Sequence, residues 1–199
     1  VIVGLISAFP EAVLSIDTTS GAVAEMALEA GVTIINDVSG GTEDNAMFQI
    51  AARHDAPLIL MHGYGPQFSA SKIEEYQYRD VVSEVFSWLE QRIALAREHG
   101  IKLLLADIGF GFAKGVEDNI SLLRDHEKFI RLGVPLVLGV SRKSTIGNIL
   151  GGLPHHGRLS GSIAAAVYGA EHGARIIRTH DVKETSEALL IIDRLRSAS

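Results

Sequence analysis

Charged and polar residues stand at the ends of six short apolar runs spread along the sequence. A Gly- or Ser-rich turn and a helical pattern follow each run, which is typical of strand–helix alternation. The polar residues at these ends are Asp17, Asn36 with Asp37, His62, Asp107, Ser141 with Arg142 and Lys143, and Arg178 with His180. Asp, Asn and Ser are common helix N-caps, but Arg, Lys and His are not, and they occupy three of the six ends. Capping alone does not account for the pattern, so the convergence predicts a ligand site.

The chemistry of these side chains divides into two sets. One set offers hydrogen-bond acceptors and an amide, which suit a ring rich in N–H donors such as a pterin, and consists of Asp17, Asn36 and Asp107. The other set is cationic, suits a phosphate or pyrophosphate, and consists of Arg142, Lys143, Arg178 and His180. A ligand with a donor-rich heterocycle at one end and an anionic leaving group at the other would satisfy both sets.

The segment 107–114 reads Asp-Ile-Gly-Phe-Gly-Phe-Ala-Lys and follows the fourth apolar run. Its two glycines give the backbone freedom. Phe110 and Phe112 could stack on flat rings, or they could close the top of the core, and the sequence leaves both interpretations open. Lys114 is expected to be a solvated loop lysine.

The elements that must position these residues follow from the apolar pattern. Strands are predicted at Ala12–Asp17, Thr33–Asp37, Pro57–His62, Lys102–Asp107, Pro135–Val140 and Arg175–Thr179. Helices are predicted at Ala22–Ala30, Ile73–His99, Asn119–Leu132, Ser162–His172 and Glu184–Arg196. The last of these begins with a capping-box pattern, Asp181 followed by Glu184. Glycines are placed where helices should stop, at Gly31, Gly100, Gly133 and Gly173.

This alternation indicates a parallel α/β protein, and the fold class expected is a TIM-type (β/α)8 barrel. No G-x-G-x-x-G follows a first strand, which disfavours a dinucleotide-binding sheet. Eight units need about 250 residues, and six are found here. Residues 1–199 are therefore expected to form a single, N-terminally incomplete barrel domain from a longer protein, with Val1–Phe9 as the tail of a preceding helix. Gly63–Ser71 and Thr145–Arg158 are predicted to be irregular, mobile loops over the barrel mouth.

Composition narrows the partners. A net charge of −6 disfavours nucleic acid, and no apolar run approaches the length of about 18 residues that spans a membrane. The chain has no cysteine, which excludes disulfides and thiolate metal sites and makes a reducing cytoplasm the expected location. The expected partners are the small-molecule substrates that the two sets of site residues suit, without nucleic acid or membrane.

Five of these segments resemble signatures of the dihydropteroate synthase family, in the family's order and with similar spacing. The segments are 15–18, 35–41, 107–114, 139–144 and 178–182. The resemblance implies that Asp17, Asn36, Asp107 and Lys143 bind a pterin ring, with Met61 and Phe112 lining its pocket. It also implies that Arg178 and His180 hold a pyrophosphate. Further implied roles are that Arg142 and Ser144 form the rim for para-aminobenzoate or a sulfonamide, and that Gly139 lines the site.

In that family the arylamine of para-aminobenzoate displaces pyrophosphate from 6-hydroxymethyl-7,8-dihydropterin pyrophosphate. The resemblance therefore implies a transferase of folate biosynthesis in which Lys143, Asp107, Arg178 and His180 carry the catalysis. It implies Mg²⁺ as cofactor, with its ligand outside these 199 residues, and a homodimer. Such chemistry asks the protein to align two rings and to stabilise the leaving group, and it needs no nucleophilic side chain.

The sequence departs from the family at several positions. Ile108 stands where Pro is usual, Ala113 stands where Gly is common, and the Met61-His62 motif is one residue short. His62 is thus either a site residue or a structural histidine. Two other functions stay open: a pterin-binding methyltransferase, which has no pyrophosphate to hold, and a pterin-binding fragment that is inactive alone.

Overall fold

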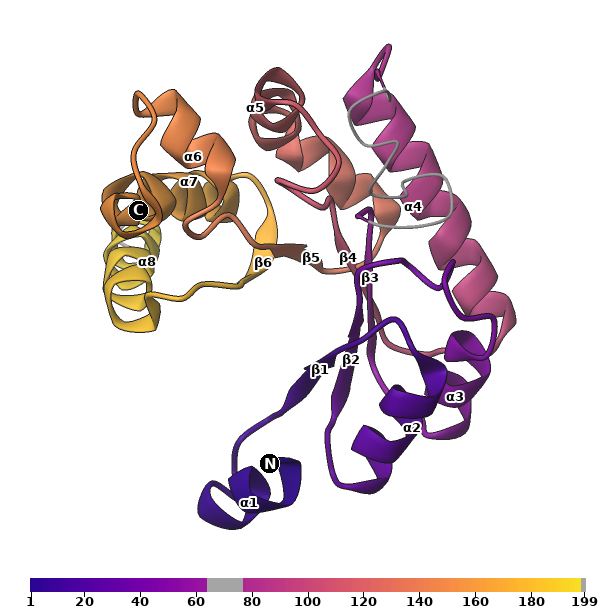
Figure 1. Cartoon of the computed structure of the whole chain (residues 1–199). Helices are drawn as coiled ribbons and strands as arrows, with labels where there is room; N and C mark the ends of the chain where they lie inside the picture. Colours follow the sequence, from indigo (N-terminus) through magenta and orange to yellow (C-terminus); the bar gives the residue numbers. More distant parts are fainter. Residues whose placement is uncertain (64–76, 198–199) are drawn as a thin grey trace.

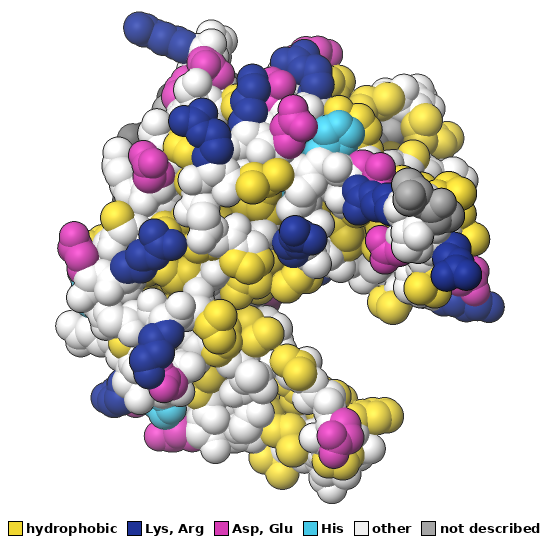
Figure 2. Space-filling model, turned by 180° about the vertical axis from the view of Figure 1, so that it is seen from behind, with side chains coloured by type: hydrophobic (Ala, Val, Ile, Leu, Met, Phe, Trp, Pro, Cys, Tyr) yellow, Lys and Arg dark blue, Asp and Glu magenta, His cyan; other side chains and the backbone are white. Residues whose placement is uncertain are grey.

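The structure, a computed structural model, describes residues 1–63 and 77–197. In this part of the chain the six strands form one parallel sheet in sequence order. They are β1 (Ser15–Asp17), β2 (Ile34–Asp37), β3 (Leu58–Met61), β4 (Leu104–Asp107), β5 (Leu136–Leu138) and β6 (Ala174–Ile177). The sheet curls, with most helices on its outer side and an open side between α1 and α8 (Figure 1). From behind, the molecule is hollowed from one side, and hydrophobic side chains line part of the hollow (Figure 2).

Helices connect successive parallel strands, as in the β/α units of a barrel. They are α1 (Ile2–Ala8), α2 (Gly21–Glu29), α3 (Met47–Arg53), α4 (Val81–Glu98), α5 (Val116–Arg124), α6 (Ser144–Ile149), α7 (Leu159–Glu171) and α8 (Val182–Ser197), with the 3₁₀ helices η2 (His126–Leu132) and η3 (His155–Gly157). None of the helices formed by the described residues is long and apolar enough to cross a membrane. The prediction of six βα units of a TIM-type barrel is confirmed.

Successive side chains along a strand point to opposite faces of the sheet, and each face has its own apolar cluster. The large core lies between the sheet and the helices and includes Leu58, Leu60 and Leu136. A smaller cluster on the other face of the sheet contains Ile59, Leu105 and Val137. This second cluster lies inside the curl of the sheet. It forms a packed apolar layer below the carboxyl ends of the strands.

Each predicted strand is present, although all are shorter than predicted. β1 and β5 show the largest differences, since only Ser15–Asp17 of the predicted Ala12–Asp17 and Leu136–Leu138 of the predicted Pro135–Val140 form strands. Within the described residues β1 pairs with β2 alone, so one side of its ladder has no strand partner. The four predicted helix-stop glycines all adopt positive φ, from 68° to 101°.

The predicted helix Asn119–Leu132 is wrong as a single element. α5 ends at Arg124, and a 3₁₀ helix follows from His126. The buried residues of this second segment are spaced by three, and they are His126, Phe129 and Leu132. A 3₁₀ helix has three residues per turn and therefore places all three on one face, which an α-helix of 3.6 residues per turn does less well.

Three further expectations need correction. The predicted loop Thr145–Arg158 contains most of α6, in which Thr145, Ile146 and Gly147 are buried, and also η3. α3 was not predicted at all, although four of its seven residues are buried. The predicted helix Ile73–His99 begins later, at Val81, where Asp80 Oδ1 accepts a hydrogen bond from Ser83 N at 3.2 Å. Residues 64–76, which include most of the predicted loop Gly63–Ser71, lie outside the described part of the chain.

Candidate functional site

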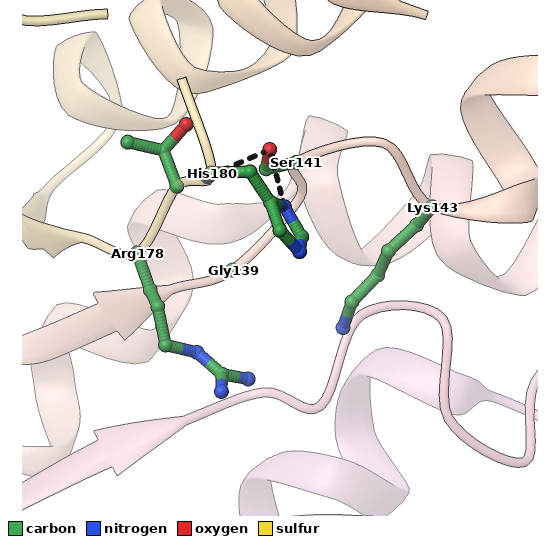
Figure 3. Close-up of a pocket in the computed structure, with 6 residues that line it drawn as sticks. Gly139, Ser141, Lys143, Arg178 and His180 are labelled. Atoms are coloured by element: carbon green, nitrogen blue, oxygen red, sulfur yellow. Dashed lines mark hydrogen bonds between the residues drawn. The ribbon is translucent and has the colours of Figure 1, made fainter. Parts of the chain in front are cut away.

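A pocket of about 140 Å³ lies at the carboxyl ends of β5 and β6. Its lining residues come from the two loops that follow these strands, and they are Gly139, Ser141, Lys143, Arg178, Thr179 and His180. Figure 3 shows the imidazole, the guanidinium and the ammonium directed toward a common space. This pocket, which we call the anion pocket, thus brings together four of the predicted site residues: Gly139, Lys143, Arg178 and His180. Ser141 and Thr179 complete its lining.

Ser141 fixes the position of His180. The buried Ser141 Oγ accepts a hydrogen bond from the backbone N–H of His180 at 3.1 Å and lies 2.9 Å from its ring nitrogen Nδ1 (Figure 3). The other ring nitrogen, Nε2, is on the opposite side of the imidazole. Because a single hydroxyl holds both the backbone and the ring, the loop after β6 is tied to the loop after β5.

Arg178 links the anion pocket to the acceptor residues Asp17 and Asn36. Its Nη1 atom forms an ion pair with Asp17 Oδ2 at 3.2 Å. Asp17 also accepts a hydrogen bond from the side-chain amide of Asn36. A Cβ atom at Gly139 would come within 3.3 Å of Arg178 Nε, so the glycine provides room for the guanidinium. Asp17, Asn36 and Arg178 therefore form one chain of contacts across the mouth of the curled sheet.

Asp107 is the deepest acceptor of the site. It is 3% exposed, it ends β4, and its Oδ1 atom accepts a hydrogen bond from Gly109 N at 2.7 Å. Burial raises the pKa of this carboxyl, and the positive charges of Lys143, Arg178 and Lys114 oppose that rise. A buried carboxylate surrounded by three cations is suited to accept hydrogen bonds from a donor-rich ring.

Lys143 stands where the two sets of residues meet. Its ammonium donates to the backbone oxygen of Phe110 and lies 4.2 Å from the centre of the Phe112 ring. Burial lowers the pKa of Lys143 to about 8, and the Asp107 carboxylate partly restores it. The same side chain lines the anion pocket. One ammonium is therefore shared between the carboxylate side and the anion side of the site.

The aromatic and thioether candidates have different environments. Met61 is fully buried and pairs in register with Asp107 on the neighbouring strand. Phe110 is 1% exposed, which confirms that it closes the top of the core. Phe112 is only partly buried and carries the Lys143 ammonium above its ring. Of the two phenylalanines, Phe112 is therefore the one that can contact a flat ligand.

Arg142 and Ser144 flank Lys143 but have other surroundings. The Arg142 guanidinium is bound by the Asp181 carboxylate, with Nε 2.8 Å from Oδ2. Asp181, which was predicted to start a capping box, is therefore the ion-pair partner of Arg142. Ser144 is exposed at the first position of α6. A contact of these two residues with para-aminobenzoate stays a prediction.

The prediction that Lys114 is a solvated loop lysine is wrong. Its ammonium donates to the backbone oxygens of His62, Gly109 and Phe112 at 2.8, 3.1 and 2.9 Å. Burial lowers the pKa of Lys114 to about 7. The sequence shows a lysine at the end of a glycine-rich segment and gives no local sign that the chain folds back around it.

His62 has the environment of a structural histidine. It is 2% exposed, its ring meets the Trp88 ring edge to face at 4.9 Å, and its backbone N–H donates to Asp107 O at 3.1 Å. Burial lowers its pKa to about 3, so the imidazole is neutral at physiological pH. A neutral ring in an aromatic environment is not an anion ligand, which favours the structural interpretation.

Asp37 is also structural. It is fully buried, and its carboxylate accepts hydrogen bonds from the backbone N–H groups of Ser39 and Gly41 at 2.8 and 2.6 Å. Arg92 of α4 donates to the oxygens of Gly40 and Gly41 at 2.7 and 2.9 Å. These bonds hold the loop after β2 closed, so the neighbouring Asn36 is left as the residue of this strand end that reaches the site.

The described residues do not build a metal site. Between residues 1–63 and 77–197, no three His, Asp or Glu side chains are grouped so that they could hold a metal ion. Mg²⁺ prefers several oxygen ligands in octahedral geometry and keeps water on most of its positions. Because one or two carboxylates with substrate phosphates are enough to hold Mg²⁺, Mg²⁺ as cofactor stays a prediction.

We predict that Gly109→Ala lowers the free energy of unfolding by roughly 2–5 kcal/mol. Gly109 has φ of 67°, and a Cβ atom there would lie 1.9 Å from the backbone oxygen of His62. The matched control is Gly157→Ala, because the nearest atoms to its new Cβ lie at 3.8 Å. Urea unfolding followed by circular dichroism measures both. Equal stability of the two variants would contradict the close approach of this loop to β3.

The fold and the site define the class of protein: a parallel β/α barrel protein with an acceptor-rich and a cationic subsite at the carboxyl ends of its strands. Residues 1–180 match the family described as pterin binding enzyme. The chain therefore belongs to the pterin binding enzyme family.

Relatives with assigned functions are similar along nearly the whole chain. A dihydropteroate synthase of Synechocystis sp. is 39% identical over 184 residues, which are 92% of this chain and 63% of the relative. The dihydropteroate synthase of Escherichia coli is 40% identical over 187 residues, 93% of this chain and 65% of the relative. The chain thus spans about two thirds of the length of these curated relatives.

Solved structures agree with the fold. Dihydropteroate synthase from Stenotrophomonas maltophilia superposes with a TM-score of 0.92 at 36% identity and covers 100% of this chain and 74% of its own. The Thermus thermophilus enzyme in complex with 4-aminobenzoate gives 0.91 at 37% identity, covering 98% of this chain and 78% of its own. The same Thermus enzyme has been solved in complex with 6HMPPP.

Proposed function

We propose that this chain carries the pterin and pyrophosphate sites of a dihydropteroate synthase. The reaction would join 6-hydroxymethyl-7,8-dihydropterin pyrophosphate to para-aminobenzoate, giving dihydropteroate and pyrophosphate in folate biosynthesis. The observation that carries the proposal is the anion pocket formed by Ser141, Lys143, Arg178 and His180 directly beside the buried acceptor Asp107. Complexes of related structures with 4-aminobenzoate, 6HMPPP and 7,8-dihydropteroate support it.

The residues divide the work by charge. Asp107, with Asn36 and Asp17 nearer the mouth, would accept hydrogen bonds from the pterin ring, and Phe112 would pack on it. The arylamine nitrogen of para-aminobenzoate attacks the methylene carbon, a C–N bond forms, and the C–O bond to pyrophosphate breaks. The amine loses a proton, and the oxygen of the leaving group gains negative charge.

The cationic pocket lowers the barrier to that step. Arg178, His180 and Lys143 surround the space in which the pyrophosphate would lie (Figure 3). Cations that are already in place stabilise charge as it develops, without reorganising during the reaction. A pterin-binding methyltransferase has no such leaving group, so this pocket favours the synthase over that alternative.

We propose that Mg²⁺ enters with the pyrophosphate as part of the substrate, because substrate phosphates commonly supply its ligands and the described residues hold no cluster of three metal-ligating side chains. We also propose a cytoplasmic homodimer, as the resemblance implies. Exposed apolar residues on α8 agree with an association of copies, and they are Val182, Leu190, Ile191 and Leu195.

The proposal is tested by isothermal titration of the chain with dihydropterin pyrophosphate, with and without Mg²⁺, and separately with inorganic pyrophosphate. We expect both ligands to bind one site per chain and to compete, with a higher affinity for the pterin ligand when Mg²⁺ is present. Dihydropteroate formation in the presence of para-aminobenzoate is measured alongside. A folded chain that binds neither ligand would overturn the proposal, and binding without turnover would favour the inactive pterin-binding fragment.

A further inference from the structure

We propose that Lys114 is a positioning residue that holds the loop 107–115 in the conformation that presents Asp107 and Phe112 to the pterin. This inference rests on the proposed function for its ligand and on the contacts of Lys114 for its mechanism. Lys114 is not among the residues that line the anion pocket, which come from the loops after β5 and β6.

The ammonium of Lys114 is bound by three backbone carbonyls. It donates to His62 O at 2.8 Å, to Phe112 O at 2.9 Å and to Gly109 O at 3.1 Å. A lysine ammonium has three N–H donors, so each donor has one acceptor. Two of these acceptors belong to the loop 107–115 and the third to the end of β3. The lysine therefore ties the loop to the neighbouring strand and also to itself.

The loop needs such a tie because its backbone is strained. Gly109, Gly111 and Ala113 have φ of 67°, 79° and 48°. A left-handed conformation is costly for alanine, which has a Cβ, and persists only where the surroundings enforce it. Ala113 directly precedes Lys114 in the sequence, so the bonds of the ammonium fix the segment in which this strain is held.

A second clamp closes the other side of the loop. Asn119 of α5 is 1% exposed, and its Oδ1 atom accepts a hydrogen bond from Gly111 N at 2.6 Å. Its Nδ2 atom donates to Lys114 O at 3.2 Å and to Gly115 O at 2.8 Å. Asn119 thus fixes the loop to α5, and Lys114 fixes it to β3. Lys114 therefore adds a side-chain link between the loop and the end of β3, beside the backbone bond from His62 N to Asp107 O at 3.1 Å.

Displacement of this loop would disturb the pterin side of the site more than the anion side. Asp107 accepts a bond from Gly109 N, and the Phe112 ring lies under the Lys143 ammonium. His180, by contrast, is held by Ser141, which belongs to another loop. A comparison of the affinities for dihydropterin pyrophosphate and for inorganic pyrophosphate can therefore distinguish a positioning role of Lys114 from a general loss of structure.

The test is Lys114→Met, which removes the three donors and keeps an unbranched side chain that is one atom shorter. The matched control is Lys102→Met. Lys102 lies just before β4, its side chain is 76% exposed, and it pairs with Asp55 on the surface. We expect Lys114→Met to lower the affinity for dihydropterin pyrophosphate about 10-fold or more, as loss of a hydrogen-bonded charge does. The affinity for inorganic pyrophosphate should fall by a clearly smaller factor, because Lys143 is the pocket residue that contacts this loop while Arg178 and His180 are held elsewhere. The control should change neither affinity.

A second readout needs no ligand. Amide hydrogen exchange by NMR should speed up about 10-fold or more at Gly109 and Phe112 in Lys114→Met, because local opening sets these rates. The reference amide is Ala106, which donates to Pro135 O at 3.1 Å in the sheet and should stay unchanged. If the native chain binds no pterin, the proposed function fails, and this exchange measurement still decides the role of Lys114.

Chemical rescue completes the test. The chain has no cysteine, so Lys114→Cys can be alkylated in the unfolded state with 2-bromoethylamine, which restores an ammonium at nearly the length of lysine. Refolded protein should regain pterin affinity, and alkylation with iodoacetamide should not restore it. The proposal is overturned if Lys114→Met weakens both ligands equally, if it changes neither the affinities nor the exchange rates, or if it abolishes cooperative unfolding of the whole chain.

Discussion

Asp107→Asn is expected to weaken binding of dihydropterin pyrophosphate about 100-fold, which corresponds to about 2.7 kcal/mol. Oδ1 of Asp107 is engaged by Gly109 N, and none of the described residues donates a hydrogen bond to Oδ2. A donor-rich ring edge would use the free acceptor positions of this carboxylate. The carboxamide of Asn replaces one acceptor by a donor, so that at least one N–H of the ring would face another N–H group.

The fold should tolerate this change. Burial raises the pKa of Asp107, which means that the ionised carboxylate is disfavoured in the folded protein relative to the unfolded chain. Asn has nearly the same shape and carries no charge, so the free energy of unfolding should stay within about 1 kcal/mol. Loss of ligand binding with an unchanged free energy of unfolding is typical of a residue that contacts the ligand.

The measurement is isothermal titration of both proteins at pH 7, with urea unfolding as the measure of stability. Asp55→Asn is the matched control, since Asp55 is an exposed partner of Lys102 on the surface. A control affinity equal to that of the native chain is expected. If Asp107→Asn binds the pterin as tightly as the native chain does, Asp107 is not the pterin acceptor. Lowering the pH toward the raised pKa should weaken the native chain in the same direction, because protonation removes the same acceptor.

Lys143→Met should reduce the affinity for inorganic pyrophosphate roughly 30-fold, or by about 2 kcal/mol. The ammonium is one of three cationic or imidazole groups around the pocket, and the Asp107 carboxylate acts on its charge. Lys183→Met is the control, because Lys183 is exposed in the first turn of α8 and does not line the pocket. Unchanged pyrophosphate affinity in Lys143→Met would remove Lys143 from the anion site.

The pH dependence gives an independent check on the same residue. Burial lowers the pKa of Lys143 to about 8, so the side chain is charged below pH 8 and loses its proton as the pH rises above it. The affinity of the native chain should therefore fall between pH 7 and pH 9 relative to that of Lys143→Met. Ionisation of pyrophosphate itself affects both proteins alike and cancels in the ratio. A ratio that does not change with pH would show that the ammonium contributes no charge to binding.

The sequence by itself determined the order of the elements and the residues at the strand ends. Apolar runs of strand length and glycines at helix ends depend on local periodicity, which is readable without coordinates. The polar residues that follow those runs were predicted to converge because parallel strands point the same way. Asp17, Asn36, Asp107, Lys143, Arg178 and His180 do lie at the same end of the curled sheet.

Tertiary structure alone decided which of these side chains face the site. Asp37, His62 and Arg142 were indistinguishable in sequence from their neighbours, yet each has partners from other elements: Asp37 holds its own loop near Arg92, His62 packs on Trp88, and Arg142 pairs with Asp181. Arg92, Trp88 and Asp181 lie 26 to 55 residues away in the sequence from these side chains, and partners at such separations leave no local periodic signal. The orientation of a polar side chain depends on which distant group can satisfy it, and that is fixed only when the chain has packed.

Lys114 shows the same limit most clearly. In sequence it is a lysine at the end of a glycine-rich segment, and such a residue is ordinarily solvated. In the structure its ammonium is buried because three backbone carbonyls from two segments converge on it. The close approach of Gly109 to His62, which brings those carbonyls together, is a product of strand pairing between β3 and β4. The sequence supplied the lysine, and the packing of the sheet gave it partners.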